Sequence, residues 1–159
     1  MVEQQADMKD ELKRAVELTR AEEFEEALEI FNSHLLGMTT GSINEKRFAA
    51  GTLSYYGLCV AMVKRRYSEG VKYCRLSVKA NMFDPEHRYN LARVYVERGN
   101  RRQAFEALNA GLQLEPHHKR LNRLLDQIGR RRPPLIPLLG RDNPINVWLG
   151  KMARREQKD

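Results

Sequence analysis

Histidine and cysteine are the residues of this chain best suited to metal binding or nucleophilic catalysis. The four histidines are His34, His87, His117 and His118. None of them is spaced from a cysteine or a carboxylate as metal ligands are, and no CxxC pair occurs. Cys59 and Cys74 fit small buried side chains better than reactive thiols. With no phosphate-binding glycine loop and no paired catalytic acids, the sequence predicts a non-enzymatic protein with no catalytic residue, no metal site and no cofactor.

Size and composition are those of one ordinary domain. The chain has 159 residues, of which 42% are apolar and 31% charged, so it can bury a core without help from disulfide bonds or metal ions. Two cysteines suit a reducing compartment. The first ten residues are polar and acidic, unlike a secretory signal, and no apolar run approaches the roughly 20 residues of a spanning helix. We therefore expect a cytoplasmic protein with no transmembrane segment.

Charge is distributed unevenly along the chain. The formal net charge is +7, but residues 1–40 hold ten acidic and four basic side chains. Residues 117–159 hold eleven basic and four acidic ones. The first 116 residues are thus neutral overall, and the excess belongs to the C-terminal end. A basic end of this kind is either a solvated face or a surface for phosphate groups.

Apolar residues recur at helical spacing, and strand patterns are nearly absent. The clearest apolar faces combine Phe24, Ala27, Leu28 and Phe31; Ala104, Phe105, Leu108 and Leu112; and Leu121, Leu124, Leu125 and Ile128. Glycines and prolines separate these segments. The sequence predicts an all-α protein of seven or eight helices, in which the polar residues of helix 117–129, Arg120 and Arg123 among them, face water.

Three segments of the sequence align with one another. Each places a small residue, Ala27, Gly70 or Ala104, four positions before a larger apolar one. Gly70 and Ala104 are 34 residues apart, whereas Ala27 and Gly70 are 43 apart. A small residue lets one helix approach another closely, so the alignment predicts repeated helical hairpins.

The third segment resembles the tetratricopeptide repeat (TPR) family. Its matching residues are Leu91, Ala92, Tyr95, Gly99, Ala104, Leu108, Gly111 and Pro116. The first segment matches through Ala15, Leu18, Phe24, Ala27 and Phe31, whereas the second departs, with Gly57 one place early. The resemblance implies an α-solenoid of three hairpins at about 8–36, 43–80 and 85–116, closed by a capping helix at 117–129, which together form domain 1–129.

The same resemblance implies a binding groove along the first helix of each hairpin. The family positions carried over are Tyr55, Cys59, Met62, Tyr89, Arg93 and Val96. The alternative is that these side chains pack against neighbouring helices. Members that grip chaperone tails use Lys, Asn or Arg at set positions, which here hold Leu12, Val16, Tyr56, Glu86 and Asn90. Recognition of a chaperone tail by that clamp is therefore not expected.

Residues 130–159 form a basic C-terminal extension. It begins with Arg130, Arg131, Arg132 and two prolines, which favour an extended segment. Asn143 and Pro144 then predict the start of a short amphipathic helix that contains Trp148. We expect the extension to pack on the domain; exchange between protomers and a membrane-surface helix are the alternatives. The three arginines and Trp148 are a candidate second contact surface.

The sequence as a whole favours protein recognition. We expect a bacterial adaptor or scaffold that binds a peptide or a partner helix in the groove implied by the TPR resemblance. One alternative is a secretion-type chaperone for a protein substrate. A second is binding of nucleic acid or an anionic surface by the basic C-terminal region. Because the two ends carry opposite charge, a homo-oligomer is a further expectation.

Overall fold

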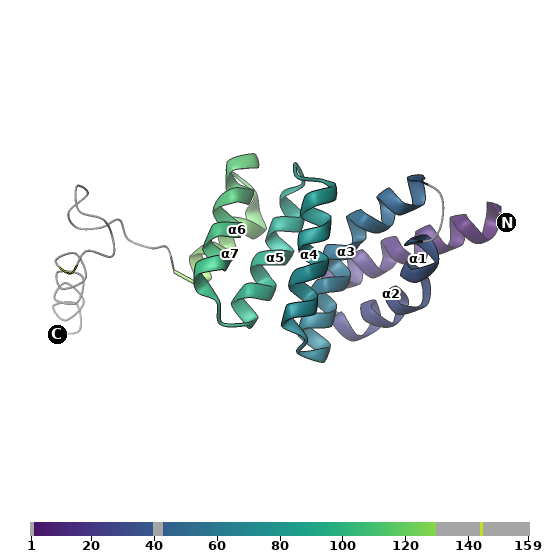
Figure 1. Cartoon of the computed structure of the whole chain (residues 1–159), viewed down its shortest axis with the longest axis horizontal. Helices are drawn as coiled ribbons and strands as arrows, with labels where there is room; N and C mark the ends of the chain where they lie inside the picture. The colour runs from purple at the N-terminus through teal and green to yellow at the C-terminus, as the bar shows by residue number, and fades with distance from the viewer. Residues whose placement is uncertain (1, 40–42, 130–143, 145–159) are drawn as a thin grey trace. The chain divides into compact units, whose positions relative to one another are not determined.

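The computed structural model describes residues 2–39, 43–129 and 144, and the side chains of 7–34, 50–129 and 144. In this part of the chain there are seven α-helices and no strand, which confirms the all-α prediction (Figure 1). The helices are α1 (Val2–Arg20), α2 (Phe24–Thr39), α3 (Ile43–Lys64), α4 (Tyr67–Ala80), α5 (Pro85–Glu97), α6 (Arg101–Leu114) and α7 (Lys119–Gln127). They belong to one compact unit, Met1–Ile128. Apart from Pro144, the C-terminal extension with Arg130, Arg131, Arg132 and Trp148 lies outside the described residues.

Local signals explain where several helices begin. The Asp84 side chain accepts a hydrogen bond of 2.9 Å from the Glu86 amide, and Pro85 is the first residue of α5. A proline at this position loses no helical hydrogen bond, because the amide it lacks would have had no partner. Asn100 caps α6 in the same way, accepting from the Gln103 amide at 3.2 Å.

Each helix packs against the next one along the chain. In addition, α1 contacts α3, α3 contacts α5, and α5 contacts α7. Within the described residues no such contact joins α2 to α4 or α4 to α6. The odd-numbered helices are therefore connected by contacts from α1 to α7, whereas the even-numbered helices of this part of the chain are not.

The turns inside the three hairpins share an unusual backbone conformation. Glu22, Arg65 and Gly99 all have positive φ angles, of 68°, 56° and 79°. They are 43 and 34 residues apart, the same intervals that separate Ala27, Gly70 and Ala104. Glycine adopts this left-handed conformation without cost, but only Gly99 is a glycine. The turns after α1, α3 and α5 thus share one backbone conformation, at the same intervals as the small residues.

The core consists of two apolar clusters. One joins α1, α2 and α3 through Leu12, Phe31 and Cys59, and the other extends from Leu58 to Leu125. Ala27, Gly70 and Ala104 are all buried, as the alignment of the three segments predicted. Leu121, Leu124 and Leu125 are buried as well, which confirms the predicted apolar face of the last described helix. No helix in the described ranges is long and apolar enough to cross a bilayer.

Candidate functional site

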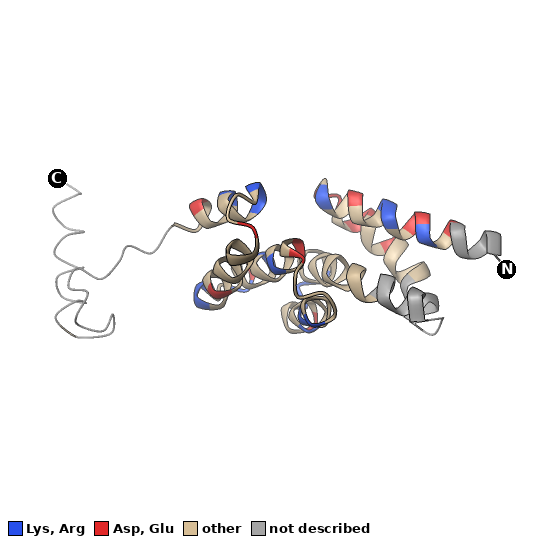
Figure 2. Cartoon of the chain, turned by 90° about the horizontal axis from the view of Figure 1, so that it is seen from above, with Lys and Arg blue, Asp and Glu red and all other residues tan. Residues whose placement is uncertain are grey.

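A cavity of about 330 Å³ opens between α1, α5 and α7. Its lining residues are Arg20, Glu22, Tyr89, Arg93, Arg120, Arg123, Leu124 and Gln127. Basic residues at the end of α1 and the start of α7 lie across from one another at this place (Figure 2). Arg20 and Arg120, which are 100 positions apart in the sequence, thus line the same cavity.

Arg93 is fixed on the wall of the cavity by two hydrogen bonds. Its Nη1 donates to Glu22 Oε1 at 2.7 Å and to the Tyr89 hydroxyl at 3.1 Å. The Arg93 side chain is only 15% exposed, whereas that of Glu22 is 59% exposed. Glu22 reaches Arg93 from the left-handed turn after α1. The guanidinium is thus oriented by the protein before any ligand arrives.

Arg120 lies over the ring of Tyr89. Its guanidinium carbon is 4.1 Å from the ring centroid, a distance at which a cation is attracted to the aromatic face. Its Nη1 also donates to Glu86 Oε2 at 2.5 Å. The sequence predicted that this arginine faces water, but the packing of α7 on α5 makes it partly buried.

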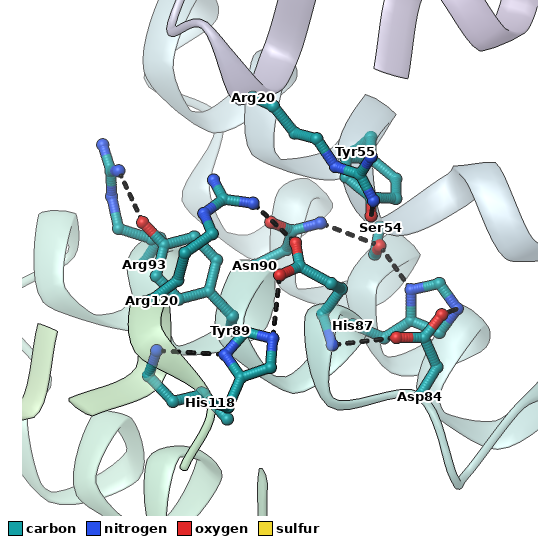
Figure 3. Close-up of polar contacts among 12 residues, drawn as sticks. Arg20, Ser54, Tyr55, Asp84, His87, Tyr89, Asn90, Arg93, His118 and Arg120 are labelled. Carbon is teal, nitrogen blue, oxygen red and sulfur yellow. Dashed lines mark hydrogen bonds and ion pairs between the residues drawn. The ribbon is translucent and has the colours of Figure 1, made fainter. Parts of the chain in front are cut away.

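Glu86 is the fixed anion beneath the cavity. Besides Arg120 it has His118, whose Nε2 lies 3.0 Å from Glu86 Oε1. The other ring nitrogen of His118, Nδ1, accepts from the Leu121 amide at 3.3 Å and so caps α7. A neutral imidazole with its proton on Nε2 satisfies both contacts (Figure 3).

Arg20 is the third oriented arginine. It donates to the Tyr55 hydroxyl at 3.2 Å and to Glu17 Oε1 at 2.8 Å, and its guanidinium carbon is 5.6 Å from the Tyr55 ring centroid. Burial and the nearby Glu86 carboxylate raise the pKa of Tyr55, so its hydroxyl stays protonated while its oxygen accepts from Arg20. Tyr55 and Tyr89, which are 34 residues apart, therefore each hold one arginine.

Arg123 completes the basic lining. Its side chain is exposed, and it makes no ion pair within residues 7–34 and 50–129. Arg20, Arg93 and Arg120 are each paired with a carboxylate, of Glu17, Glu22 and Glu86 in turn, so Arg123 leaves the lining with a net positive charge. Such a cavity can hold a carboxylate or another oxygen anion, because planar guanidinium groups donate two parallel hydrogen bonds to these groups.

The six residues implied by the TPR resemblance are distributed over different environments. Tyr89 and Arg93 line the cavity, and Tyr55 contacts it through Arg20. Cys59 has no exposed surface and shares a hydrogen bond of 3.2 Å with the Thr19 hydroxyl. Met62 and Val96 are partly buried against the core. Because the two tyrosines are only 5% and 7% exposed, the surface offered to a ligand is arginine rather than aromatic.

A scan against protein-family models finds no match for this chain, and a search of the curated proteins finds none either. What the cavity can bind therefore follows from its own residues. The sequence did not predict that three of the arginines, Arg20, Arg120 and Arg123, belong to this site. The available signal was that Arg120 and Arg123 lie on the helix that must cap the last hairpin.

A buried polar network lies behind the cavity. Ser54 Oγ is 2.9 Å from His87 Nδ1, Asn90 Nδ2 donates to the same oxygen at 3.0 Å, and His87 Nε2 is 3.5 Å from Asp84 Oδ2 (Figure 3). The order of serine, histidine and aspartate is that of a nucleophile with its base. Ser54 has no exposed surface, however, and its hydroxyl is shared between two side chains, so in this conformation the network joins α3 to α5.

Asn90 Oδ1 is buried and has no hydrogen-bond partner in the described part of the chain. Asn90, the one residue whose type fits the chaperone-tail clamp, is thus buried inside the protein. Glu86, at another of those positions, is held by Arg120 and His118. In the described ranges no group of three or more histidines, cysteines and carboxylates is placed to hold a metal ion.

Proposed function

We propose that this chain is a non-enzymatic protein-recognition module of the tetratricopeptide-repeat type. Its helices would form three hairpins, α1–α2, α3–α4 and α5–α6, with α7 as the cap. Two observations support this assignment. Small buried residues recur after 43 and 34 residues, and the turns after α1, α3 and α5 each contain a residue with a left-handed backbone at the same two intervals. A stack of such hairpins buries a continuous core while its first helices line one open face.

The observation that carries the proposal is the cavity between α1, α5 and α7. A repeat stack uses its open face to bind extended or helical segments of other proteins. Here that face holds a cavity of about 330 Å³ with arginines already fixed by tyrosine hydroxyls and carboxylates. Pre-organised side chains bind with a smaller loss of conformational entropy than free ones do. The cavity would thus anchor one or two side chains of a partner.

Comparison of two double variants tests this function. The full chain, carrying an affinity tag, is used to capture proteins from its native cell extract. In one variant Arg120 and Arg123 are changed to glutamine; in the other, Arg66 and Arg102, which are exposed and outside the cavity, are changed in the same way. The proposal expects a captured partner to be lost with the first variant and kept with the second. Equal capture by wild type and both variants would contradict it.

A further inference from the structure

We infer that the segment held in this cavity is acidic, and that Glu22 acts as an internal competitor for it. The inference rests on the proposed function, since it names the chemistry of the partner that the cavity takes. The occupant is a stretch of a partner protein that presents glutamate or aspartate side chains. Its carboxylate would bind to Arg93 in the place that Glu22 Oε1 now occupies, at 2.7 Å from the guanidinium.

Charge in the cavity favours an anion. Three carboxylates pair with the lining arginines: Glu17 with Arg20, Glu22 with Arg93 and Glu86 with Arg120. Glu86 is 15% exposed and is also bound by His118, so it is a permanent part of the site. Arg123 makes no ion pair within the described side chains. An incoming carboxylate would therefore find at least one arginine without a countercharge. A basic segment would be repelled, because its charges would lie close to those of the lining arginines.

Burial increases the strength of an ionic contact at Arg93. The side chain is mostly shielded from water, and one of its donors is bound by the Tyr89 hydroxyl (Figure 3). Coulombic attraction is larger where fewer water molecules screen it. A carboxylate bound here would gain more than at an exposed arginine such as Arg102.

Glu22 can leave Arg93 easily. Its side chain is 59% exposed, so the released carboxylate returns to water without a burial penalty. Its left-handed backbone is set by the hairpin turn, which does not depend on the ion pair. Exchange of one carboxylate for another then keeps the number of ion pairs constant. Glu22 thus lowers the affinity for an acidic segment and selects segments that bring more than one contact.

Three matched peptides test the inference with the full chain. They share the same apolar residues and carry glutamate, glutamine or lysine at four fixed positions; fluorescence anisotropy of a labelled end reports binding. The glutamate peptide is expected to bind most tightly. Arg123→Gln should weaken it about twofold to fivefold, as the loss of one partly screened ion pair does. Glu22→Gln should tighten it by about twofold to fivefold, since Arg93 is freed.

Two control variants separate the cavity from net charge. Arg102→Gln and Glu106→Gln make the same charge changes at an exposed pair on α6, away from the cavity. We expect both variants to bind the glutamate peptide with the wild-type affinity, within experimental error. If Glu106→Gln tightened binding as much as Glu22→Gln, or if Glu22→Gln had no effect, the role given to Glu22 would be overturned.

The outcomes also separate this inference from the proposed function. If the glutamine peptide bound as tightly as the glutamate peptide while the loss of Arg120 and Arg123 abolished capture of a partner, the recognition function would stand and the acidic occupant would be wrong. Binding of none of the three peptides would likewise overturn the acidic occupant. A second copy of the chain is the other occupant to examine. Sedimentation that showed self-association, lost in Arg123→Gln, would assign the cavity to it instead.

Discussion

Gly57 on α3 and Gly70 on α4 meet face to face where the two helices cross. A β-carbon added to Gly70 would lie 2.6 Å from the Gly57 carbonyl oxygen and 3.0 Å from the Ala61 β-carbon. The obstacle is backbone, which cannot move aside as a flexible side chain can. Gly70→Ala is therefore expected to lower the free energy of unfolding by about 1–3 kcal/mol, measured by urea denaturation.

Gly51→Ala is the matched control on α3. No atom lies within 4 Å of a β-carbon at that position, so only helix propensity changes. This substitution should raise the free energy of unfolding by up to about 1 kcal/mol. If both variants were more stable than wild type, the close crossing of α3 and α4 would be refuted.

The same glycine pair shows what the sequence could and could not predict. The aligned segments identified Gly70 as a residue of close approach, because a small residue recurred there at a fixed interval. Its partner was not identified, because the second segment departs from the family pattern there, with Gly57 one place early. Which residue of α3 faces Gly70 depends on the rotation of one helix against the other, and a pattern along one chain does not contain that rotation.

Substitutions in two of the hairpin turns should change the free energy of unfolding in opposite directions. Arg65 has a φ of 56°, in a region that costs a side chain with a β-carbon roughly 1–2 kcal/mol. Arg65→Gly should therefore raise the free energy of unfolding by up to about 1 kcal/mol, after the extra freedom of glycine in the unfolded chain is subtracted. Gly99→Ala, at the equivalent turn, should lower it by about 1 kcal/mol. Thermal denaturation of the two variants would detect both changes, and a loss of stability in Arg65→Gly would contradict the repeated turn.

The two cysteines are expected to be unreactive while the protein is folded. Both are fully buried, and burial raises the pKa of Cys59 to about 12 and that of Cys74 further still. Because the thiolate is the reactive form, a thiol reagent near neutral pH should modify neither side chain natively and both after unfolding. Rapid modification of the native protein would show that one of them is accessible.

His87 should make the stability of the protein depend on pH. Burial lowers its pKa below the ordinary value near 6.5, although Asp84 and Glu86 act in the opposite direction. As the pH falls through about 6.5, the unfolded chain binds more protons at this residue than the folded one does. The contribution of His87 to stability is therefore fully present above this pH and decreases as the pH falls further, toward the lower pKa of the folded state.

Substitution of His87 isolates this effect from other titrating groups. Charging His87 would also disturb its contact with the Ser54 hydroxyl, which already accepts a hydrogen bond from Asn90. Urea denaturation at about pH 7.5 and about pH 5 should show a smaller loss of stability in His87→Gln than in wild type. Equal losses in the two proteins would show that His87 does not contribute.

The candidate site was predictable only in part. Tyr89 and Arg93 came from the TPR resemblance, which implies that the first helix of the third segment lines a groove. Arg20 and Arg120 could not be found this way. They reach the cavity from the end of α1 and the start of α7, so their positions depend on how successive hairpins stack.

The most direct test of the account is contact between the cavity and a partner. A photo-crosslinking amino acid is placed at Gln127, an exposed residue of the cavity lining, and separately at Glu106, an exposed residue of α6. Each protein is irradiated in its native extract, and covalent adducts are identified by mass spectrometry. The account predicts an adduct with a segment of another protein from position 127 and none from position 106. Adducts from position 106 alone, or none from position 127, would contradict it.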